Sequence, residues 1–145
     1  MNKKKITYLV LIIVWISFIW ANSLEPATSS SEQSHFVMEL LNRITGIFGF
    51  YLSEFVVRKL AHMFEFFVLA FLTINLIKVT KESFENRYYA YALLFSMLIA
   101  GVDETIQLFV PGRAGMLTDV LIDSSGALIG LVLFAIYQKV KRKYV

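Results

Sequence analysis

Three apolar segments of this sequence contain acidic residues, and one of them also contains a histidine. His62 and Glu65 lie in the first of these segments, Asp103 and Glu104 near the end of the second, and Asp119 at the start of the third. Ionisable side chains in apolar segments are costly, so they usually face the interior of a helix bundle or a wet cavity and are functional candidates. A carboxyl–imidazole set can move protons in general acid–base catalysis. We therefore interpret these five residues as candidate catalytic groups.

The spacing of these residues places them on single helix faces, because side chains three or four positions apart lie on one side of an α-helix. Pairs at i,i+4 occur in each of the three segments: Arg58 and His62, Asp103 and Gln107, and Asp119 and Asp123. Counted along the segments, all of them lie within about two helical turns of the same membrane surface. The sequence therefore predicts that three helices direct carboxyl, imidazole and amide groups into one outward-facing pocket.

The loop after the second of these segments adds a cationic side chain. In residues 110–113 (VPGR), Pro followed by Gly favours a tight turn, because Pro fixes φ and Gly tolerates a positive φ. This turn would hold Arg113 over the mouth of the pocket. Arginine suits bidentate recognition of carboxylate or phosphate, so Arg58 and Arg113 are candidate anion contacts. The remaining candidate substrate-binding residues are Gln107, Asp123 and Asn22.

The composition of the chain excludes a water-soluble globule. Of its 145 residues, 57% are apolar and 17% are charged, and the mean hydropathy is +0.64. Soluble domains are about 45–50% apolar and about 25% charged. The absence of Cys excludes a disulfide scaffold, thiolate catalysis and metal sites built on sulfur. The net charge of +3 in so apolar a chain indicates membrane orientation rather than a nucleic-acid partner.

Four apolar runs are long enough to cross a bilayer, whose hydrocarbon core is about 30 Å thick. We predict membrane-spanning helices at residues 6–21, 60–77, 88–110 and 117–138, within a single membrane domain that covers residues 1–145. Gly126 and Gly130 form a small-xxx-small pair in the fourth span, and such pairs let another helix approach closely. The predicted fold class is therefore an all-α membrane protein with four transmembrane helices.

Lysine and arginine residues predict the orientation of these spans. Most of the 14 basic residues lie before the first span, between the second and third, and after the fourth. Cytoplasmic loops carry an excess of Lys and Arg, so both termini of this multi-pass protein are predicted to be cytoplasmic. The rival interpretation of the first apolar run is a cleaved signal peptide, but no small-x-small cleavage site follows it.

The segment from residue 22 to about residue 57 is predicted to lie outside the membrane core, on the extracytoplasmic side. Residues 22–34 are polar and indicate an external loop, at whose end Ser30 and Gln33 resemble a capping box. Beyond it, apolar residues recur at helical spacing and polar residues occupy the other face, which predicts an amphipathic helix. This helix would lie in the outer membrane interface or pack onto the outer mouth of the bundle.

Four motifs occur in order along about four fifths of the chain: WANS followed by a proline (residues 20–26), RKLAHMFEFF (58–67), DETIQLFVPGR (103–113) and DVLIDSSGALIG (119–130). In these motifs the sequence resembles the VanZ-like family of bacterial membrane proteins. The resemblance implies a small multi-span protein of the bacterial cell membrane, and one member of that family accompanies glycopeptide-resistance operons and lowers susceptibility to teicoplanin. A role in teicoplanin resistance is therefore expected, whereas the resemblance assigns no catalytic residue.

The predicted pocket needs positive charge or protons. Five acids face two arginines, because Lys59 is expected to turn to the lipid headgroups, and isolated charges in a low dielectric cost several kcal/mol each. Shared protons, a basic group of a ligand or a divalent cation such as Mg²⁺ could neutralise them. Oxygen ligands suit Mg²⁺, Mn²⁺ or Ca²⁺ better than zinc, but no spacing here matches a known metal motif, so no metal ligands are assigned.

Three kinds of function fit these residues. As an enzyme, the protein would use His62 or Glu65 as a general base on a lipid-linked head group. As a binding protein, it would hold a membrane lipid, a lipid-linked envelope precursor or a glycopeptide without chemistry. As a structural protein, it would tie helix ends together through Arg58–Glu65 and Arg113–Asp119 ion pairs. A transporter is disfavoured because the inner halves of the spans are nearly free of ionisable groups, and the sequence indicates no oligomeric state.

Overall fold

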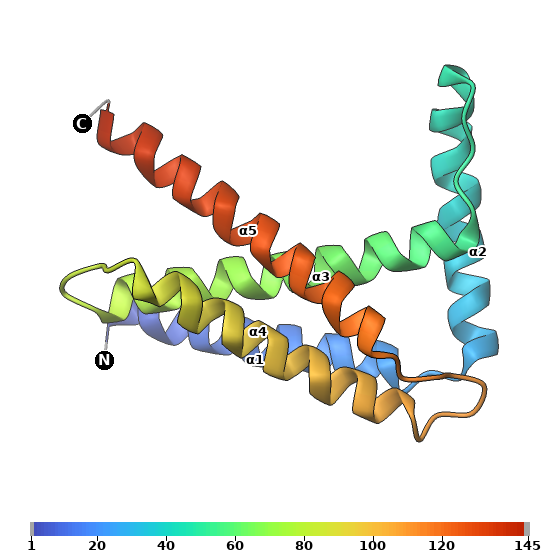
Figure 1. Ribbon diagram of the computed structural model, residues 1–145, viewed down its shortest axis with the longest axis horizontal. Coiled ribbons are helices and arrows are strands. Elements are labelled where there is room, and N and C mark those ends of the chain that lie inside the picture. Colours follow the sequence, from blue (N-terminus) through green and yellow to red (C-terminus); the bar gives the residue numbers. More distant parts are fainter. Residues whose placement is uncertain (1, 144–145) are drawn as a thin grey trace.

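The computed structural model describes residues 2–143, and within this range every regular element is a helix. Four long helices form a bundle, and a fifth helix stands across one end of it (Figure 1). The elements are α1 (Lys3–Ser23), α2 (Ala27–Thr45), the short 3-10 helix η1 (Gly46–Phe48), α3 (Glu54–Thr80), α4 (Arg87–Gln107) and α5 (Leu117–Lys143). Helices α3 and α4 each contact the other three bundle helices, and α3 also contacts α2, so α3 is the central helix of the fold.

The four bundle helices correspond to the predicted membrane spans. Helices α1, α3, α4 and α5 are each long and apolar enough to cross a membrane, which confirms the all-α class and the four spans. Helix α3 begins at Glu54, before the predicted residue 60, because Ser53 caps its first turn by accepting a hydrogen bond from the N–H of Val56. Helix α4 ends at Gln107 rather than at residue 110, because a turn follows in which Gly112 has a φ of 76°.

The polar stretch that is predicted to be an external loop is largely helical. Helix α2 begins at Ala27, directly after Pro26, whose fixed φ is compatible with a helix start. The N–H of Ser30 donates to the carbonyl of Pro26 within the first turn, so the predicted capping box of Ser30 and Gln33 is wrong. No residue of α2 is buried, and its apolar face is uncovered. The location of this helix in the membrane interface stays a prediction.

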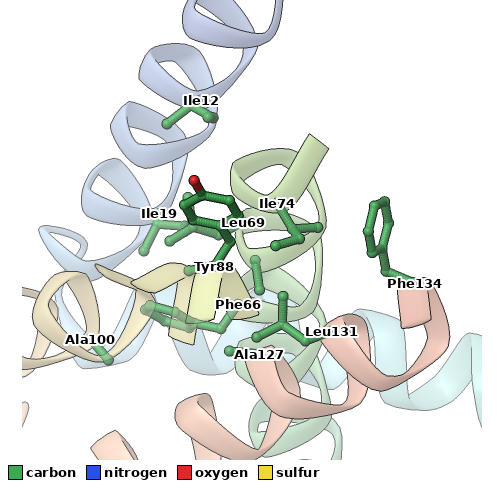
Figure 2. Close-up of a cluster of buried hydrophobic side chains, with 12 residues drawn as sticks. Ile12, Ile19, Phe66, Leu69, Ile74, Tyr88, Ala100, Ala127, Leu131 and Phe134 are labelled. Atoms are coloured by element: carbon green, nitrogen blue, oxygen red, sulfur yellow. The ribbon is translucent and has the colours of Figure 1, made fainter. Parts of the chain in front are cut away.

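The hydrophobic core lies between α1, α3, α4 and α5 (Figure 2). Ile19 of α1, Phe66 and Leu69 of α3 and Ala127 of α5 have no exposed surface. In a membrane, close packing of side chains rather than escape from water holds helices together. This packed core therefore fixes how each helix is rotated about its axis, and with it the direction of the ionisable residues near the helix ends.

Helix α5 packs closely on α3 at the predicted small-xxx-small pair. A Cβ atom at Gly126 would overlap the carbonyl group of Met63, and one at Gly130 would lie 2.7 Å from the carbonyl oxygen of Phe67. Both positions therefore require glycine, as the pair predicts. Asp123 is about one helical turn from Gly126, so this contact also sets the position of an acidic residue against α3.

Replacing Gly126 with alanine is expected to destabilise the fold by about 1–3 kcal/mol, because the backbone of Met63 must move to admit the methyl group. Thermal unfolding in detergent measures the effect as a lower Tm. Gly101→Ala is the matched control, because a Cβ there meets no atom within 4 Å and alanine favours a helix by about 1 kcal/mol. Equal Tm values for the two variants would contradict the close contact.

Candidate functional site

Four ionisable side chains from three helices meet at the end of the bundle where α4 ends and α5 begins. They are His62 of α3, Asp103 and Glu104 of α4, and Asp123 of α5, and one donor atom of each lies within 4.8 Å of the others. The three acids are buried, with exposed fractions of 0% for Asp103, 5% for Glu104 and 0% for Asp123, whereas His62 is partly buried. We call these four residues the acidic cluster.

The amide of Gln107 joins the two acids of α4. Its Nε2 donates to Asp103 Oδ2 at 3.1 Å and to Glu104 Oε1 at 3.2 Å, because residues three and four positions apart lie on one helix face. Oε2 of Glu104 accepts a hydrogen bond of 2.8 Å from the backbone N–H of Met116, just before α5. Gln107 therefore orients both carboxylates, and Glu104 holds the start of α5.

Asp123 and His62 have polar atoms without a hydrogen-bond partner among the described residues. Both carboxylate oxygens of Asp123 are buried and unpaired, and so are Oδ1 of Asp103 and Nδ1 of His62. His62 Nδ1 lies 3.7 Å from Asp123 Oδ1, which is longer than a hydrogen bond. Buried polar groups without partners cost about 1–3 kcal/mol each. The arrangement therefore favours a binding partner that these side chains do not provide for one another.

Glu65 lies beside the acidic cluster and faces α1. Its Oε1 accepts a hydrogen bond of 2.8 Å from Asn22 Nδ2, and its backbone carbonyl accepts one of 2.8 Å from Trp15 Nε1. The carboxyl group is buried and within electrostatic range of Asp103. Asn22, which the sequence places among the substrate-binding residues, therefore holds the candidate base Glu65 in position.

The side chain of Arg113 is hydrogen-bonded to backbone carbonyls of the protein itself. Its Nε donates to the carbonyl of Glu25 and its Nη2 to the carbonyl of Asn22, both at 2.8 Å. These carbonyls lie at the end of α1, where a helix leaves acceptors unsatisfied. Burial lowers the pKa of Arg113 from its ordinary value, and the nearby Arg58 guanidinium lowers it further, although a guanidinium stays protonated in proteins. Arg113 therefore caps α1, and its contact with a ligand stays a prediction.

The ion pairs of Asp119 and Lys59 differ from those expected. Lys59 Nζ lies 2.6 Å from Asp119 Oδ2, so the prediction that Lys59 turns to the lipid headgroups is wrong. The proposed Arg113–Asp119 pair is also wrong, because both side-chain bonds of Arg113 go to backbone carbonyls. The close packing of α5 on α3 brings the first turn of α5 beside the start of α3, which explains the pair that forms.

Arg58 is likewise paired differently. Its Nη2 lies 2.6 Å from Glu54 Oε1 and donates to Ser31 Oγ at 3.0 Å, rather than pairing with Glu65. Glu54 is four positions away on the same helix face, which is a favourable spacing for an ion pair. Arg58 therefore joins the start of α3 to α2 and does not enter the acidic cluster.

The structure thus brings most of the predicted site residues to one place. Five of them form one group: His62, Asp103, Glu104, Gln107 and Asp123. Three more border this group: Glu65, Asn22 and Asp119. The remaining two, Arg58 and Arg113, make their hydrogen bonds outside it. Ser23 is a further site residue that the sequence does not predict. It is 1% exposed, and its Oγ lies 3.4 Å from Gln107 Nε2. Its only signal in the sequence is its place in the WANS motif, which by itself specifies no contact.

The local charge balance is negative. With Asp119 paired to Lys59, the carboxyl groups of Glu65, Asp103, Glu104 and Asp123 remain. The Arg113 guanidinium acts on three of them, Glu65, Asp103 and Glu104, from the neighbouring loop. Buried charges that lack a partner are strongly unfavourable. The site therefore suits a divalent cation, a basic group of a ligand, or shared protons.

Comparison with known proteins identifies one family. The family model for VanZ/LLP1 matches residues 8–138. The matched region runs from α1 into α5, so it includes all residues of the acidic cluster and those that border it. No curated protein and no solved structure matches the chain.

Proposed function

Because the chain belongs to the VanZ/LLP1 family, we propose that it binds or modifies a component of the bacterial cell envelope at an acidic site facing the cell exterior. The observation that carries this proposal is the meeting of His62, Asp103, Glu104 and Asp123, whose buried oxygens include three without a partner in the described part of the chain. Ionisable groups inside spanning helices are costly and mark functional sites.

The basic residues at the other end of the bundle support an acidic cluster that faces the cell exterior. The start of α1, the end of α5 and the connection between α3 and α4 lie opposite the α4–α5 connection (Figure 1). Lysine and arginine residues are concentrated in those opposite segments, and such segments usually stay in the cytoplasm. With the termini in the cytoplasm, the acidic cluster would lie in the outer leaflet, within reach of envelope components at the cell surface.

A lipid-linked component fits the surroundings of His62. The side chains of Arg58, Lys59 and Arg113 are all within electrostatic range of this imidazole, which is 17% exposed. A groove of about 410 Å³ next to Arg58 is lined by Ser31, Glu32, His35, Phe36, Glu39 and Glu54. The acyl chains of such a ligand would stay in the bilayer, and its head group would lie between this groove and His62.

Chemistry at the site would use His62 or Glu65 as the general base, with an acid of the cluster as proton donor. Binding alone would use the same residues without turnover. In either form, we propose that the activity lowers susceptibility to teicoplanin, because that is the role that the family resemblance implies. The alternative is a structural or interaction protein, which the Lys59–Asp119 pair and the Arg58–Ser31 hydrogen bond favour because each joins two helices.

Replacing Glu65 with glutamine is expected to reduce the amount of co-purified envelope lipid at least about tenfold, since an interaction with a charged group contributes about 1.5–3 kcal/mol. Glutamine keeps the volume and an oxygen that can accept from Asn22, so the change tests the charge of the carboxylate. Mass spectrometry of ligands extracted from purified wild-type and variant protein measures the loss. Teicoplanin susceptibility is read in the same strains, with the exposed Glu82→Gln at the other membrane side as the control.

The outcomes separate the candidate functions. A lipid that co-purifies equally with both proteins would contradict a role for Glu65 in binding. Loss of the lipid without a change in susceptibility would separate binding from resistance. A new product after incubation of the wild type with envelope lipids would assign catalysis to the site. Neither ligand nor product with the wild type would favour the structural alternative.

A further inference from the structure

We propose that the acidic cluster is a binding site for a divalent transition-metal ion such as Mn²⁺, with His62, Asp103, Glu104 and Asp123 as its protein ligands. These residues supply three carboxylates and one imidazole from three helices. The inference deepens the proposed function by naming a cofactor for the same site, and it rests on that function for what the metal does. With His62 as a metal ligand, Glu65 is the candidate general base that remains. Binding of the metal itself can be tested separately.

The distances between donor atoms are short enough for one metal ion to contact all four residues. Each of the four residues offers an atom that lies within 4.8 Å of the others. Around an octahedral ion with bonds of about 2.1–2.4 Å, adjacent ligands lie roughly 3.0–3.4 Å apart and opposite ligands roughly 4.2–4.8 Å apart. His62 Nδ1 and Asp123 Oδ1, at 3.7 Å, are too far apart for a hydrogen bond but near the spacing of adjacent ligands.

The unpaired oxygens are an independent observation that points to a ligand. Asp123 is fully buried and neither of its oxygens has a hydrogen-bond partner among the described residues; Asp103 is also fully buried, with Oδ1 unpaired. Buried carboxylates are normally hydrogen-bonded, and exposed ones are hydrated. Oδ1 of Asp103, both oxygens of Asp123 and Nδ1 of His62 are therefore the atoms that a shared cation would coordinate.

The surrounding hydrogen bonds orient the other oxygens of the cluster. Gln107 Nε2 donates to Asp103 Oδ2 and to Glu104 Oε1, and the Met116 N–H donates to Glu104 Oε2. Partners of this kind fix metal-binding carboxylates in position, and their loss typically weakens metal affinity about 10–100-fold. In Asp103 the bond uses one oxygen, and the other is buried without a hydrogen-bond partner among the described residues.

The donor types select the class of ion. Mg²⁺ takes oxygen ligands at about 2.0–2.1 Å and keeps several waters, and Ca²⁺ takes 6–8 oxygens, so the His62 imidazole disfavours both. Zn²⁺ sites usually combine several His or Cys ligands, whereas the cluster offers one imidazole and the described residues include no free cysteine. One imidazole with several carboxylates suits Mn²⁺.

The metal would explain how an acidic site can act on an anionic head group. Its two positive charges offset carboxylates that otherwise repel a phosphate. Four protein ligands leave about two of six octahedral positions for water or for oxygen atoms of a ligand. A phosphate-bearing head group could then bind through the metal, with the neighbouring cations Arg58 and Lys59 in electrostatic range of His62.

The experiment uses Mn²⁺ alone as the probe. Full-length protein in detergent is stripped with EDTA and titrated with MnCl₂, and electron paramagnetic resonance measures the free ion. We expect about one bound Mn²⁺ per chain, a higher Tm in its presence, and affinity at least about tenfold weaker for Asp123→Asn and Asp103→Asn. Glu82→Gln is the control, because this acid is exposed in the connection between α3 and α4, at the opposite end of the bundle from the cluster. Size-exclusion profiles establish that each variant is folded.

Wild-type protein that neither binds Mn²⁺ nor gains thermal stability would overturn the inference, as would Asp123→Asn binding as tightly as the wild type. Stronger binding of Mg²⁺ or Ca²⁺ than of Mn²⁺ would overturn the choice of ion. Mn²⁺ bound without any co-purified lipid would leave the metal site standing and count against the proposed function. Lipid retained equally by metal-free wild type and Asp123→Asn would leave lipid binding standing and overturn a role for the metal in it.

Discussion

Replacing Asp123 with asparagine is expected to stabilise the metal-free protein while abolishing its function. Asp123 is fully buried, and its two oxygens have no partner among the described residues. It also lies near three further acids of the site, Asp103, Glu104 and Glu65. A neutral amide of the same size removes this repulsion, and its N–H groups can donate to a neighbouring carboxylate. The expected gain is about 1–3 kcal/mol.

Thermal unfolding in detergent with EDTA measures this gain as a higher Tm for Asp123→Asn than for the wild type. In excess Mn²⁺ the order should reverse, because the wild type binds the ion and the variant has lost a ligand. Teicoplanin susceptibility of a strain that carries the variant should equal that of a strain without the protein. A residue that is destabilising in the resting protein but necessary for function is the pattern of a binding site rather than of a structural one.

The control for this comparison is Glu82→Gln, which removes an exposed acid from the connection between α3 and α4. Its Tm should differ little from that of the wild type, because surface substitutions usually change stability by at most about 0.5 kcal/mol. A lower Tm for Asp123→Asn in EDTA would show that the carboxylate stabilises the resting protein. The acidic cluster would then be a structural network, and the alternative function would be favoured.

Which polar residues share one face of a helix could be predicted, because helical periodicity is enough to define a face. Asp103 and Gln107 are one turn apart, and they are hydrogen-bonded in the structure. The four spans could be predicted for a similar reason, since length and hydropathy suffice to recognise a helix that crosses a bilayer. Both properties are local, so neither depends on how the helices pack.

Ion pairs between helices could not be predicted, because they depend on how each helix is rotated about its axis and on the angle at which two helices cross. Lys59 meets Asp119 because Gly126 lets α5 pack against the backbone of α3 at Met63. The glycine pair predicts a close contact but not which helix makes it. The prediction of an Arg113–Asp119 pair rests on opposite charges alone, without the packing of α5 on α3, and it is wrong.

The extent of α2 cannot be predicted from the sequence, for a different reason. Polar composition in residues 22–34 suggested a loop, but a helix that is not buried can be polar over its whole first half. Pro26 precedes the helix, a position at which proline is tolerated. Ser23 was missed because a small hydroxyl residue at the end of a span has no distinctive spacing, although it contacts Gln107.

Replacing Arg113 with alanine is expected to destabilise the protein by about 2–4 kcal/mol. The guanidinium donates to the carbonyls of Glu25 and Asn22, and hydrogen bonds from charged groups contribute about 1.5–3 kcal/mol each. Asn22 in turn holds Glu65, so loosening the end of α1 should also disturb the candidate base. Thermal unfolding in detergent would show a lower Tm, by roughly 2–4 °C per kcal/mol for a chain of this length.

Arg113→Lys distinguishes a helix cap from an anion contact. Lysine keeps the positive charge but lacks the planar fork that reaches two carbonyls at once, so it should recover little of the lost stability. If the charge alone mattered, because it attracts an anionic ligand, Arg113→Lys would retain ligand binding and thermal stability close to those of the wild type. Arg43→Ala, at an exposed position in the last turn of α2, should leave both measurements unchanged. Because the cap positions Asn22 and Glu65 together, we expect ligand binding in the two Arg113 variants to fall in parallel with stability.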